Sequence, residues 1–384
     1  DIASKQGEFT RAFIALHGIE VGHNVYALPT STVSYEFTRK VYSLLGLDTS
    51  HVFSDFTTYD LLNPDKKATL MEQLKDMNFD LVIGNPPYQQ ADGGARASAK
   101  PIYHEFVAAT NTIADTLSSV LMPARWFTGG KGLDEFRKDM LDDQHIKLLY
   151  DYQQPDEVFP DTNNRGGLCF IVRDKNFDNL ASLATVVSNR GKQTVVSTQR
   201  NIKTEGLELF IRHQEAVTIL AKVRAAIDFK SFAEIVSSRR PFGIDGNIIN
   251  DQALFKSCST SSFPIACYGR SASVGYVSDL IIKNNQNWLD KWKVYVPYAN
   301  NIGTELNDDN LNGFVGAPNT VATETFLVIG AELSLEEDSA TSLVKYLKTK
   351  FVRFMHGLSK ASQHATSKTY RFVPRQDFTP QSDI

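Results

Sequence analysis

The sequence predicts an α/β protein, in which a doubly wound, Rossmann-like sheet with a terminal antiparallel hairpin is followed by a mixed α+β domain. Two observations carry this prediction. Short apolar runs alternate with segments of helical periodicity in the first part of the 384 residues, as in parallel βαβ sheets. After about residue 175 the alternation stops, and Ser, Asn and Gly become frequent. We expect residues 1–200 to form the first domain and residues 201–384 the second.

The elements of the first domain are expected in a regular order. Apolar runs of strand length occur at 21–28, 51–53, 79–83, 118–122 and 146–152. Segments with the apolar period of a helix lie between them, at 10–16, 33–45, 67–77, 102–114 and 133–141. The last strand and the apolar segment 167–172 have no helix between them, which predicts an antiparallel pair. A further helix is expected at 215–227.

The composition excludes several classes of protein. With 42% hydrophobic and 22% charged residues, the chain is neither disordered nor fibrous. Its three cysteines, Cys169, Cys258 and Cys267, form no CxxC pair, which argues against a structural zinc site and a secreted disulfide framework. The chain lacks an apolar run of membrane-spanning length and a signal-peptide profile. We therefore expect a cytoplasmic protein with neither a membrane nor a metal as partner.

The sharpest chemical signal is Asn85-Pro86-Pro87-Tyr88, directly after the apolar run 79–84. Consecutive prolines stiffen the turn, so the Asn85 amide oxygen and the Pro86 carbonyl are held as two acceptors. An exocyclic amine is their natural partner, because accepting both of its hydrogens favours a pyramidal nitrogen whose lone pair can attack. Tyr88 is placed to stack on the ring that carries the amine. The alternative is a rigid turn that only closes the strand.

Together with its strand, FDLVIGNPPY resembles the motif of the S-adenosylmethionine-dependent amino-methyltransferases, above all the N6-adenine DNA methyltransferases. The later tracts SSRRPFG and YLKTKFVRF resemble those of methyltransferases of bacterial type II restriction-modification systems. The resemblance implies S-adenosylmethionine as cofactor and double-stranded DNA as partner, and it allows for a cognate restriction endonuclease. It further implies that the catalytic residues are Asn85, Pro86, Pro87 and Tyr88, with Pro87 also bordering the cofactor.

Two other segments resemble the cofactor site of this family. Residues 1–9, DIASKQGEF, resemble its D-x-x-x-G-x-G-x-F loop, with Lys5 in place of the first glycine. Asp55 and Phe56 resemble the acid and aromatic pair that binds the adenine of the cofactor. No acid for the ribose hydroxyls stands at the end of the second predicted strand. The implied cofactor contacts in the first loop are Asp1, Ala3, Gly7 and Phe9.

The opening residues also suggest an incomplete strand. Asp1-Ile2-Ala3 looks like the end of a strand whose apolar body would come before it. We therefore expect a native segment ahead of residue 1.

Candidate DNA contacts follow the cofactor and catalytic motifs. Residues 166–170 resemble the hairpin in which an aromatic side chain holds the flipped base, and Phe170 is the candidate, with a core aromatic as the alternative. The stretch 340–376 has eight lysines and arginines, five aromatic residues and no acid, a mixture that suits phosphates and bases. A solvated helix with a basic face is the alternative. The candidate DNA contacts in the second domain are Arg239, Arg240, Lys348, Lys350 and Arg353. For each of them the alternative is an ordinary surface charge that is exposed to solvent and contacts no DNA.

These signals predict a site-specific DNA methyltransferase that transfers a methyl group to N6 of a flipped adenine by direct in-line displacement. The net formal charge of −4 does not itself indicate a nucleic-acid partner, whereas the local cation surplus does. Methylation of an RNA base or a protein glutamine is the enzymatic alternative, since Asn-Pro-Pro-Tyr suits any planar amine or amide. A non-catalytic DNA-binding subunit of the same fold is the other alternative, which the departure at Lys5 leaves open.

Overall fold

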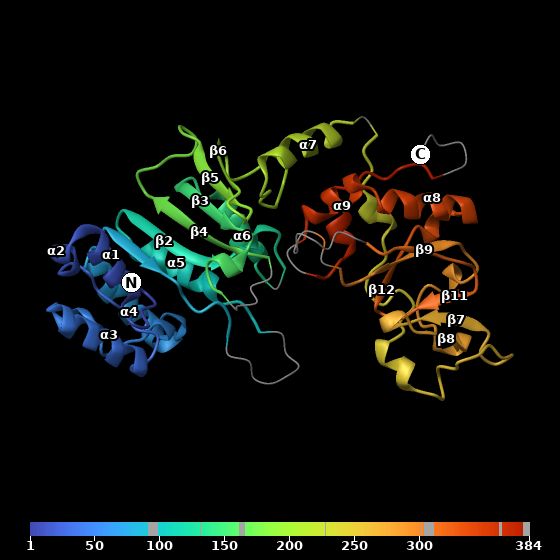
Figure 1. Cartoon of the computed structure of the whole chain (residues 1–384), viewed down its shortest axis with the longest axis horizontal. Helices are drawn as coiled ribbons and strands as arrows, with labels where there is room; N and C mark the ends of the chain where they lie inside the picture. The colour runs from blue at the N-terminus through green and yellow to red at the C-terminus, as the bar shows by residue number, and fades with distance from the viewer. Residues whose placement is uncertain are drawn as a thin grey trace. The chain divides into compact units, whose positions relative to one another are not determined.

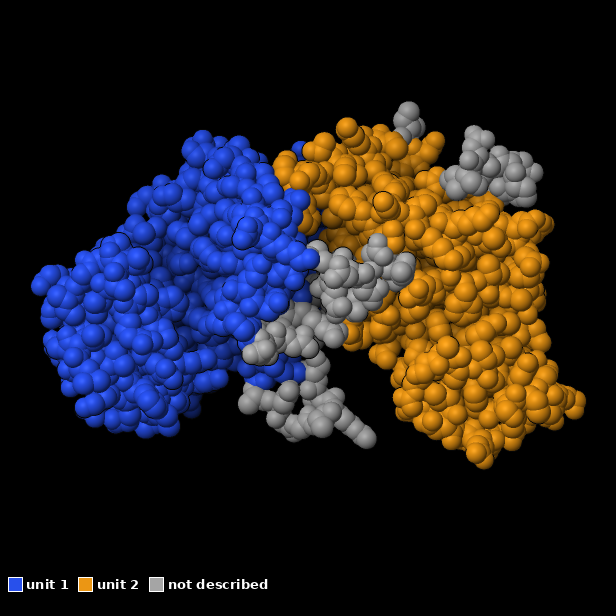
Figure 2. Space-filling view, in the orientation of Figure 1, with its two compact units in different colours: residues 1–212 blue, residues 213–384 orange. Residues whose placement is uncertain are grey.

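The structure is a computed structural model, and it describes residues 1–90, 99–130, 132–160, 166–226, 228–300, 302, 311–360 and 363–378. The chain divides into two compact units, residues 1–212 and 213–384 (Figures 1 and 2). The division falls after Arg212 rather than near residue 200. The reason is that Ile202 and Phe210, which follow the last strand of the first unit, are buried in its core.

A mixed sheet of six strands forms the centre of the first unit, in the order β1-β2-β4-β3-β5-β6. β1, β2, β3 and β5 run in one direction, while β4 and β6 are antiparallel to them (Figure 1). The carboxyl ends of the four codirectional strands therefore lie at one edge, where ligands of such sheets bind. The strands are β1 (Leu81–Gly84), β2 (Leu117–Pro123), β3 (Ile146–Tyr152), β4 (Leu168–Asp174), β5 (Ala184–Asn189) and β6 (Val195–Arg200).

Short segments extend this sheet beyond β1. Ile2 N donates to Ile83 O at 2.9 Å, and parallel bridges join Ser4 to Pro29 and Ala27 to Val52. The strands predicted at 21–28 and 51–53 are thus reduced to bridges. The helix α2 (Ile19–Gly22) takes the place of the first part of 21–28. A helical turn brings Gly22 onto α1, where a Cβ at this glycine would lie only 2.7 Å from Ile14 Cδ1.

Helices pack on both faces of the extended sheet. Neighbouring strand residues point to opposite faces. Ala27 packs in a cluster with Tyr42, whereas Leu28 packs in another cluster with Leu70 and Phe106. All of the helices predicted for this unit are present, with ends shifted by a few residues: α1 (Glu8–His17), α3 (Thr32–Leu45), α4 (Pro64–Asp76), α5 (Tyr103–Ile113) and α6 (Asp134–Asp142). The α/β class predicted for this unit is confirmed.

The antiparallel pair expected near residue 170 is formed by β3 and β4. The expectation that this pair ends the sheet is wrong, because β5 pairs with β3 and β6 pairs with β5. β6 lies at the edge, with Val195 exposed and only Arg200 fully buried. Such an edge strand has little apolar periodicity, so the sequence pattern did not separate it from a loop.

The described part of the second unit mixes short strands and helices. β9 (Lys293–Pro297) lies between β10 (Phe314–Gly316) and β12 (Phe326–Ile329), and β7 (Ile265–Tyr268) lies between β11 (Thr320–Ala322) and β8 (Val274–Val277). Tyr295 is buried between the two sheets, and its hydroxyl donates to Thr320 O at 2.9 Å. The helices include α7 (Gln214–Arg224), α8 (Glu337–Leu347) and α9 (Lys350–Gly357). None of the helices in the described ranges is long and apolar enough to span a membrane.

Candidate active site

Several chain segments meet at the carboxyl edge of the sheet beside β1. Thr58 links the segments of Ile2 and Pro29, because its hydroxyl donates to Ile2 O at 2.7 Å and its amide donates to Pro29 O at 2.8 Å. Gly84, the last residue of β1, lies against the same Ile2. The segments brought together in this way, from distant parts of the sequence, are 1–4, 28–30, 56–58 and 84–88.

Gly84→Ala is expected to lower the free energy of unfolding by about 1–3 kcal/mol, because overpacking of a tight core site has this cost. A Cβ at Gly84 would lie 2.6 Å from Ile2 Cγ1, closer than the side chain can accommodate without a shift. Denaturant unfolding measures the change. Gly246→Ala is the control, since its Cβ would meet no described atom closer than Glu324 Oε1 at 3.5 Å. Equal stability of Gly84→Ala and wild type would contradict the close approach of the two segments.

The loop Asn85-Pro86-Pro87-Tyr88 follows β1 directly. Its main chain is anchored, since Ile102 N donates to Tyr88 O at 3.1 Å and Gln90 N donates to Lys100 O at 3.0 Å. Pro86 is buried, whereas the Asn85 side chain is half-buried and forms no hydrogen bond with another described residue. The amide oxygen of Asn85 is therefore available as an acceptor on a rigidly held loop.

The Tyr88 ring is half-buried against the core. It packs on the cluster that contains Trp126 and Cys169, and its hydroxyl is buried without a hydrogen-bond partner among the described residues. Burial raises the pKa of the Tyr88 phenol well above its ordinary value, and the neighbouring Cys169 raises it further. This phenol stays neutral, so Tyr88 can offer a ring surface but not a proton-accepting phenolate.

Asp1, Ala3 and Gly7 lie in the turn that leads into α1. Asp1 Oδ1 accepts from Ala3 N at 3.0 Å, while Asp1 Oδ2 is buried and has no partner among the described residues. Gly7 caps α1 in the left-handed region at φ 69°, and a Cβ there would lie 3.3 Å from Val41 Cγ1. The unpaired carboxylate oxygen and the tight glycine turn fit a loop that closes on a polar ligand.

The other cofactor candidates lie on neighbouring segments. Asp55 is exposed and accepts from the Ser54 hydroxyl at 3.0 Å. Phe56 packs on the cluster that contains Ile2, and Phe9 is half-buried in the first turn of α1. Residues 24–29, where the ribose contact was sought, include no acidic residue. An exposed carboxylate thus stands next in sequence to an aromatic ring that packs on the cluster of Ile2, and this pair fits an adenosine.

The structure does not bring Phe170 to Tyr88. Phe170 stacks on Tyr150, with ring centroids 5.3 Å apart and an interplanar angle of 9°. Its neighbour Cys169 belongs to the core cluster on which Tyr88 packs, and successive residues of a strand point to opposite faces. Phe170 therefore lies on the face of β4 opposite Tyr88, together with two tyrosines of β3.

Sequence reasoning missed a buried ion pair at the end of β3. The Asp151 side chain is 1% exposed, and Arg212 Nη2 lies 3.1 Å from its Oδ1. Arg212 also donates to Gly166 O and lies over the Phe127 ring at 5.1 Å. Burial raises the pKa of Asp151 to about 6, and the nearby Arg212 opposes this rise. No local pattern links residues so far apart in the sequence.

The basic stretch of the second unit is only partly a surface feature. Lys348 and Lys350 are exposed where α8 meets α9, and Arg353 is half-buried in α9. Two of the interleaved aromatic side chains are partly exposed, Phe351 by 38% and Phe354 by 37%. The part of the stretch that offers exposed cations beside exposed aromatic rings is the junction of α8 and α9, while Lys345 and Lys368 are exposed elsewhere in the stretch.

Other members of the same stretch are structural. Tyr346, Tyr370 and Phe372 are buried in the core of the second unit. Lys360 is buried as well, and its ammonium donates to Asn300 O at 2.6 Å. The composition of the stretch was read correctly as basic and aromatic, but burial removes these four side chains from any docking surface.

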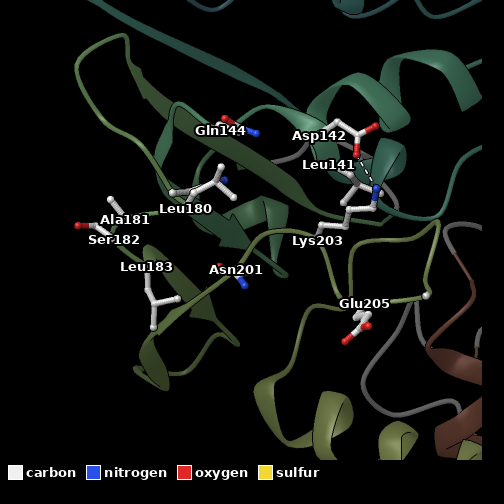
Figure 3. A pocket seen from close by; sticks show the side chains of 12 residues that line it. Leu141, Asp142, Gln144, Leu180, Ala181, Ser182, Leu183, Asn201, Lys203 and Glu205 are labelled. Carbon is white, nitrogen blue, oxygen red and sulfur yellow. Dashed lines mark hydrogen bonds and ion pairs between the residues drawn. The ribbon is translucent and has the colours of Figure 1, made fainter.

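A hollow of about 570 Å³ lies elsewhere in the first unit (Figure 3). Its lining includes Asp142 at the end of α6, Leu183 before β5 and Lys203 after β6, and Lys203 Nζ lies 2.5 Å from Asp142 Oδ1. Because β5 begins here, the hollow lies at the amino ends of the codirectional strands. It is separate from the residues around Asn85.

Known proteins resemble parts of this chain. Residues 25–159 match the family model of the Eco57I restriction-modification methylase. An uncharacterized adenine-specific methylase of Mycoplasma pneumoniae is 28% identical over 134 residues, which are 33% of this chain and 31% of the relative. The chain thus spans about a third of the length of that relative. The matched segment includes β1 and the Asn85-Pro86-Pro87-Tyr88 loop.

Solved structures give weaker similarity. The type IIG restriction endonuclease BpuSI has a TM-score of 0.42 and 11% identity, over 97% of this chain and 55% of that chain. The type IIL restriction-modification enzyme MmeI, solved in complex with DNA, has a TM-score of 0.48 and 10% identity, over 90% of this chain and 54% of that chain. Scores at this level do not establish a shared fold. The match of residues 25–159 to the family model and the adenine-specific methylase relative confirm the predicted resemblance to restriction-modification adenine methylases.

Proposed function

We propose that the protein is a site-specific DNA methyltransferase that transfers the methyl group of S-adenosylmethionine to N6 of adenine in double-stranded DNA. The observation that carries this proposal is the loop Asn85-Pro86-Pro87-Tyr88, held at the carboxyl end of β1 within the segment that matches the methylase family. The half-buried Asn85 amide supports it, since no described residue occupies this hydrogen-bonding group.

In this proposal, Asn85 and Pro86 act on the amine of the target base. The Asn85 amide oxygen and the Pro86 carbonyl each accept one hydrogen, which draws the nitrogen lone pair out of conjugation and points it at the methyl group. N6 then forms its bond to the methyl carbon, the carbon–sulfur bond breaks, and the amine releases one proton to water. Since N6 is paired inside a duplex, the adenine must first leave the stack. Tyr88 offers the ring surface on which it rests.

The cofactor site follows from the segments near β1. S-adenosylmethionine brings the methyl group as an activated sulfonium. The unpaired Asp1 carboxylate oxygen and the turn through Ala3 and Gly7 suit its amino-acid end. Asp55 and Phe56 suit its adenine, by accepting from the amino group and by packing on the ring. Phe9 and Pro87 border the same space in this proposal.

The second unit is proposed to recognise the DNA site. Its exposed Lys348, Lys350 and Phe351 support this role, because cations with interleaved aromatic rings suit a phosphate backbone and its bases. Recognition of this kind weakens steeply as salt rises. A cognate restriction endonuclease is also proposed as a partner, because the family model that residues 25–159 match is that of a restriction-modification methylase.

The proposal predicts transfer of labelled methyl from S-adenosylmethionine to unmethylated plasmid DNA. Digestion of the product to nucleosides should place the label in N6-methyladenine. Matched reactions with RNA and with total protein as acceptors test the alternative substrates. Label in RNA or in glutamine, with none in DNA, would contradict the proposal.

A further inference from the structure

A network of charged side chains occupies one end of the sheet β10-β9-β12 in the second unit. Glu324, in the turn between β11 and β12, is 16% exposed and pairs with two arginines. Arg239 Nη2 lies 3.0 Å from Glu324 Oε2, and Arg240 Nε lies 2.8 Å from the same oxygen. Arg240 Nη2 also lies 3.0 Å from Asp245 Oδ2. One largely buried carboxylate therefore fixes two neighbouring guanidinium groups.

The backbone of the second unit brings this network together. Val236 forms an antiparallel bridge to Ile329, and Ser237 N donates to Val328 O at 2.8 Å, so the chain runs along the free edge of β12 toward Glu324. Glu324 N in turn donates to Ile244 O at 3.0 Å, which holds the far end of the arginine loop. The loop is anchored on both sides, and its two arginines are half-exposed, by 53% and 52%.

The conformation of Arg240 adds a second observation. Its φ of 60° lies in the left-handed region, which a non-glycine residue adopts at a cost of about 1–2 kcal/mol. Strain of this kind persists where surrounding contacts impose it, and it concentrates at functional sites. Here the contacts are the two carboxylates of Glu324 and Asp245. Both arginines approach the same Glu324 oxygen, and the Arg239 guanidinium also lies over an aromatic ring.

That ring is Tyr298, which follows β9. The Arg239 guanidinium carbon lies 4.9 Å from the Tyr298 ring centroid. His364 stacks on the same tyrosine, with centroids 4.8 Å apart and planes 23° from parallel. Tyr298 is held in place because its amide donates to Thr325 O at 2.8 Å and its carbonyl accepts from Ala365 N at 2.7 Å. Arg239 is thus fixed both by a carboxylate and by a planar ring.

The two arginines are engaged to different degrees. Arg240 uses Nε and Nη2 for ion pairs, whereas the ion pair of Arg239 uses Nη2 alone. A guanidinium has five N–H donors in a rigid fork, so the half-exposed Arg239 has further N–H donors besides the Nη2 that approaches Glu324. Two parallel N–H donors match O6 and N7 of guanine in the major groove, and they match no other base edge as well.

We propose that Arg239 is a specificity-determining residue that reads a guanine in the DNA site, with Glu324 and Arg240 as positioning residues. Phosphate contacts need only mobile positive charge, whereas reading of a base edge needs a side chain of fixed orientation. The exposed Lys348 and Lys350 suit the first task, and the clamped Arg239 suits the second. This inference rests on the proposed recognition of DNA by the second unit, but not on methyl transfer.

The test is selection of bound duplexes from a random DNA pool by the full chain, followed by sequencing. The wild-type profile should contain an invariant guanine. Arg239→Lys keeps the charge and loses the fork, so preference for that guanine should fall about 10- to 100-fold while total binding to the pool changes little. Glu324→Gln should weaken the same preference, because it releases Arg239 without touching DNA itself.

Two comparisons separate base reading from a general charge effect. Lys348→Ala should lower binding to all sequences alike and reduce the salt dependence by about one phosphate contact. Arg39→Ala is the matched control, since Arg39 forms an exposed pair with Glu36 in α3 at 2.9 Å, and it should leave the profile unchanged.

Three results would overturn the inference: a wild-type profile without a fixed guanine, a uniform loss of binding in Arg239→Lys, or no binding to the pool. Methyl transfer is scored separately in the same preparations. A selected guanine without any transfer would support the role of Arg239 and reject the proposed activity, so the two failures can be told apart.

Discussion

Asn85→Ala is expected to reduce methyl transfer to DNA on the order of 100- to 1,000-fold in kcat, the cost of removing one preorganised hydrogen-bonding group from a reacting centre. Alanine leaves the Pro86 carbonyl in place, so one of the two acceptors for the amine remains. Single-turnover transfer of labelled methyl measures the change. Binding of S-adenosylmethionine, followed by calorimetry, should change little, because Asn85 contacts the target amine in this proposal.

The structure also predicts that this variant stays folded. The Asn85 side chain is half-buried and forms no hydrogen bond to the described part of the chain, so its removal leaves no described partner unsatisfied. Gln89→Ala is the matched control, since this exposed amide lies on the same loop but outside the proposed site. Transfer by Asn85→Ala at the wild-type rate would contradict the proposed role, and an equal loss in Gln89→Ala would point to the loop as a whole.

The first unit shows how much the sequence could predict. Its helices were located to within a few residues because their apolar period is regular, as in α3 and α5. The strand β1 and its proline turn were found because a buried run and two adjacent prolines leave a strong local signal. The bridges at Ala27 and Val52 were overestimated as strands, since an apolar run does not reveal how many residues find a pairing partner.

Some candidate site residues could be found from the sequence, whereas others are brought together only by the fold. Asn85 and Gly7 could be named as candidates because each stands in a motif of adjacent residues. Glu324, which fixes Arg239, was not identifiable, because the two residues meet only when β12 pairs with the arginine loop. Burial was also invisible in the sequence: Lys360 has the same charge as Lys350, yet its ammonium is bonded to Asn300 inside the core.

The buried ion pair of Asp151 and Arg212 predicts a large dependence of the free energy of unfolding on pH. Burial raises the pKa of Asp151 from its ordinary value of 3.8 to about 6. A carboxyl whose pKa is higher in the folded state binds its proton more tightly there, so its stabilising contribution is complete below pH 4 and is lost as pH rises through 6. A shift of about two pKa units corresponds to about 3 kcal/mol.

Asp151→Asn removes the titration of this carboxyl. The difference in the free energy of unfolding between wild type and variant therefore reports Asp151 alone, because the other acids are common to both proteins. We expect the free energy of unfolding of wild type to fall relative to Asp151→Asn by about 3 kcal/mol between pH 4 and pH 7, measured by denaturant unfolding.

The sign of the change in relative stability with pH shows whether burial or the Arg212 cation has the larger influence on the pKa of Asp151. Burial raises the pKa, whereas Arg212, with Nη2 3.1 Å from Oδ1, lowers it. If the ion pair outweighed burial, the relative stability of wild type would fall toward low pH instead of toward high pH. Arg212→Met provides the second test: without the cation, Asp151 should hold its proton to a higher pH, so the loss of stability should still begin near pH 4 but extend to a higher pH and become larger. The Arg212 guanidinium also donates to Gly166 O, and neither Asp151 carboxylate oxygen has a hydrogen-bond partner within the described residues, which fits a carboxyl whose burial is not fully offset.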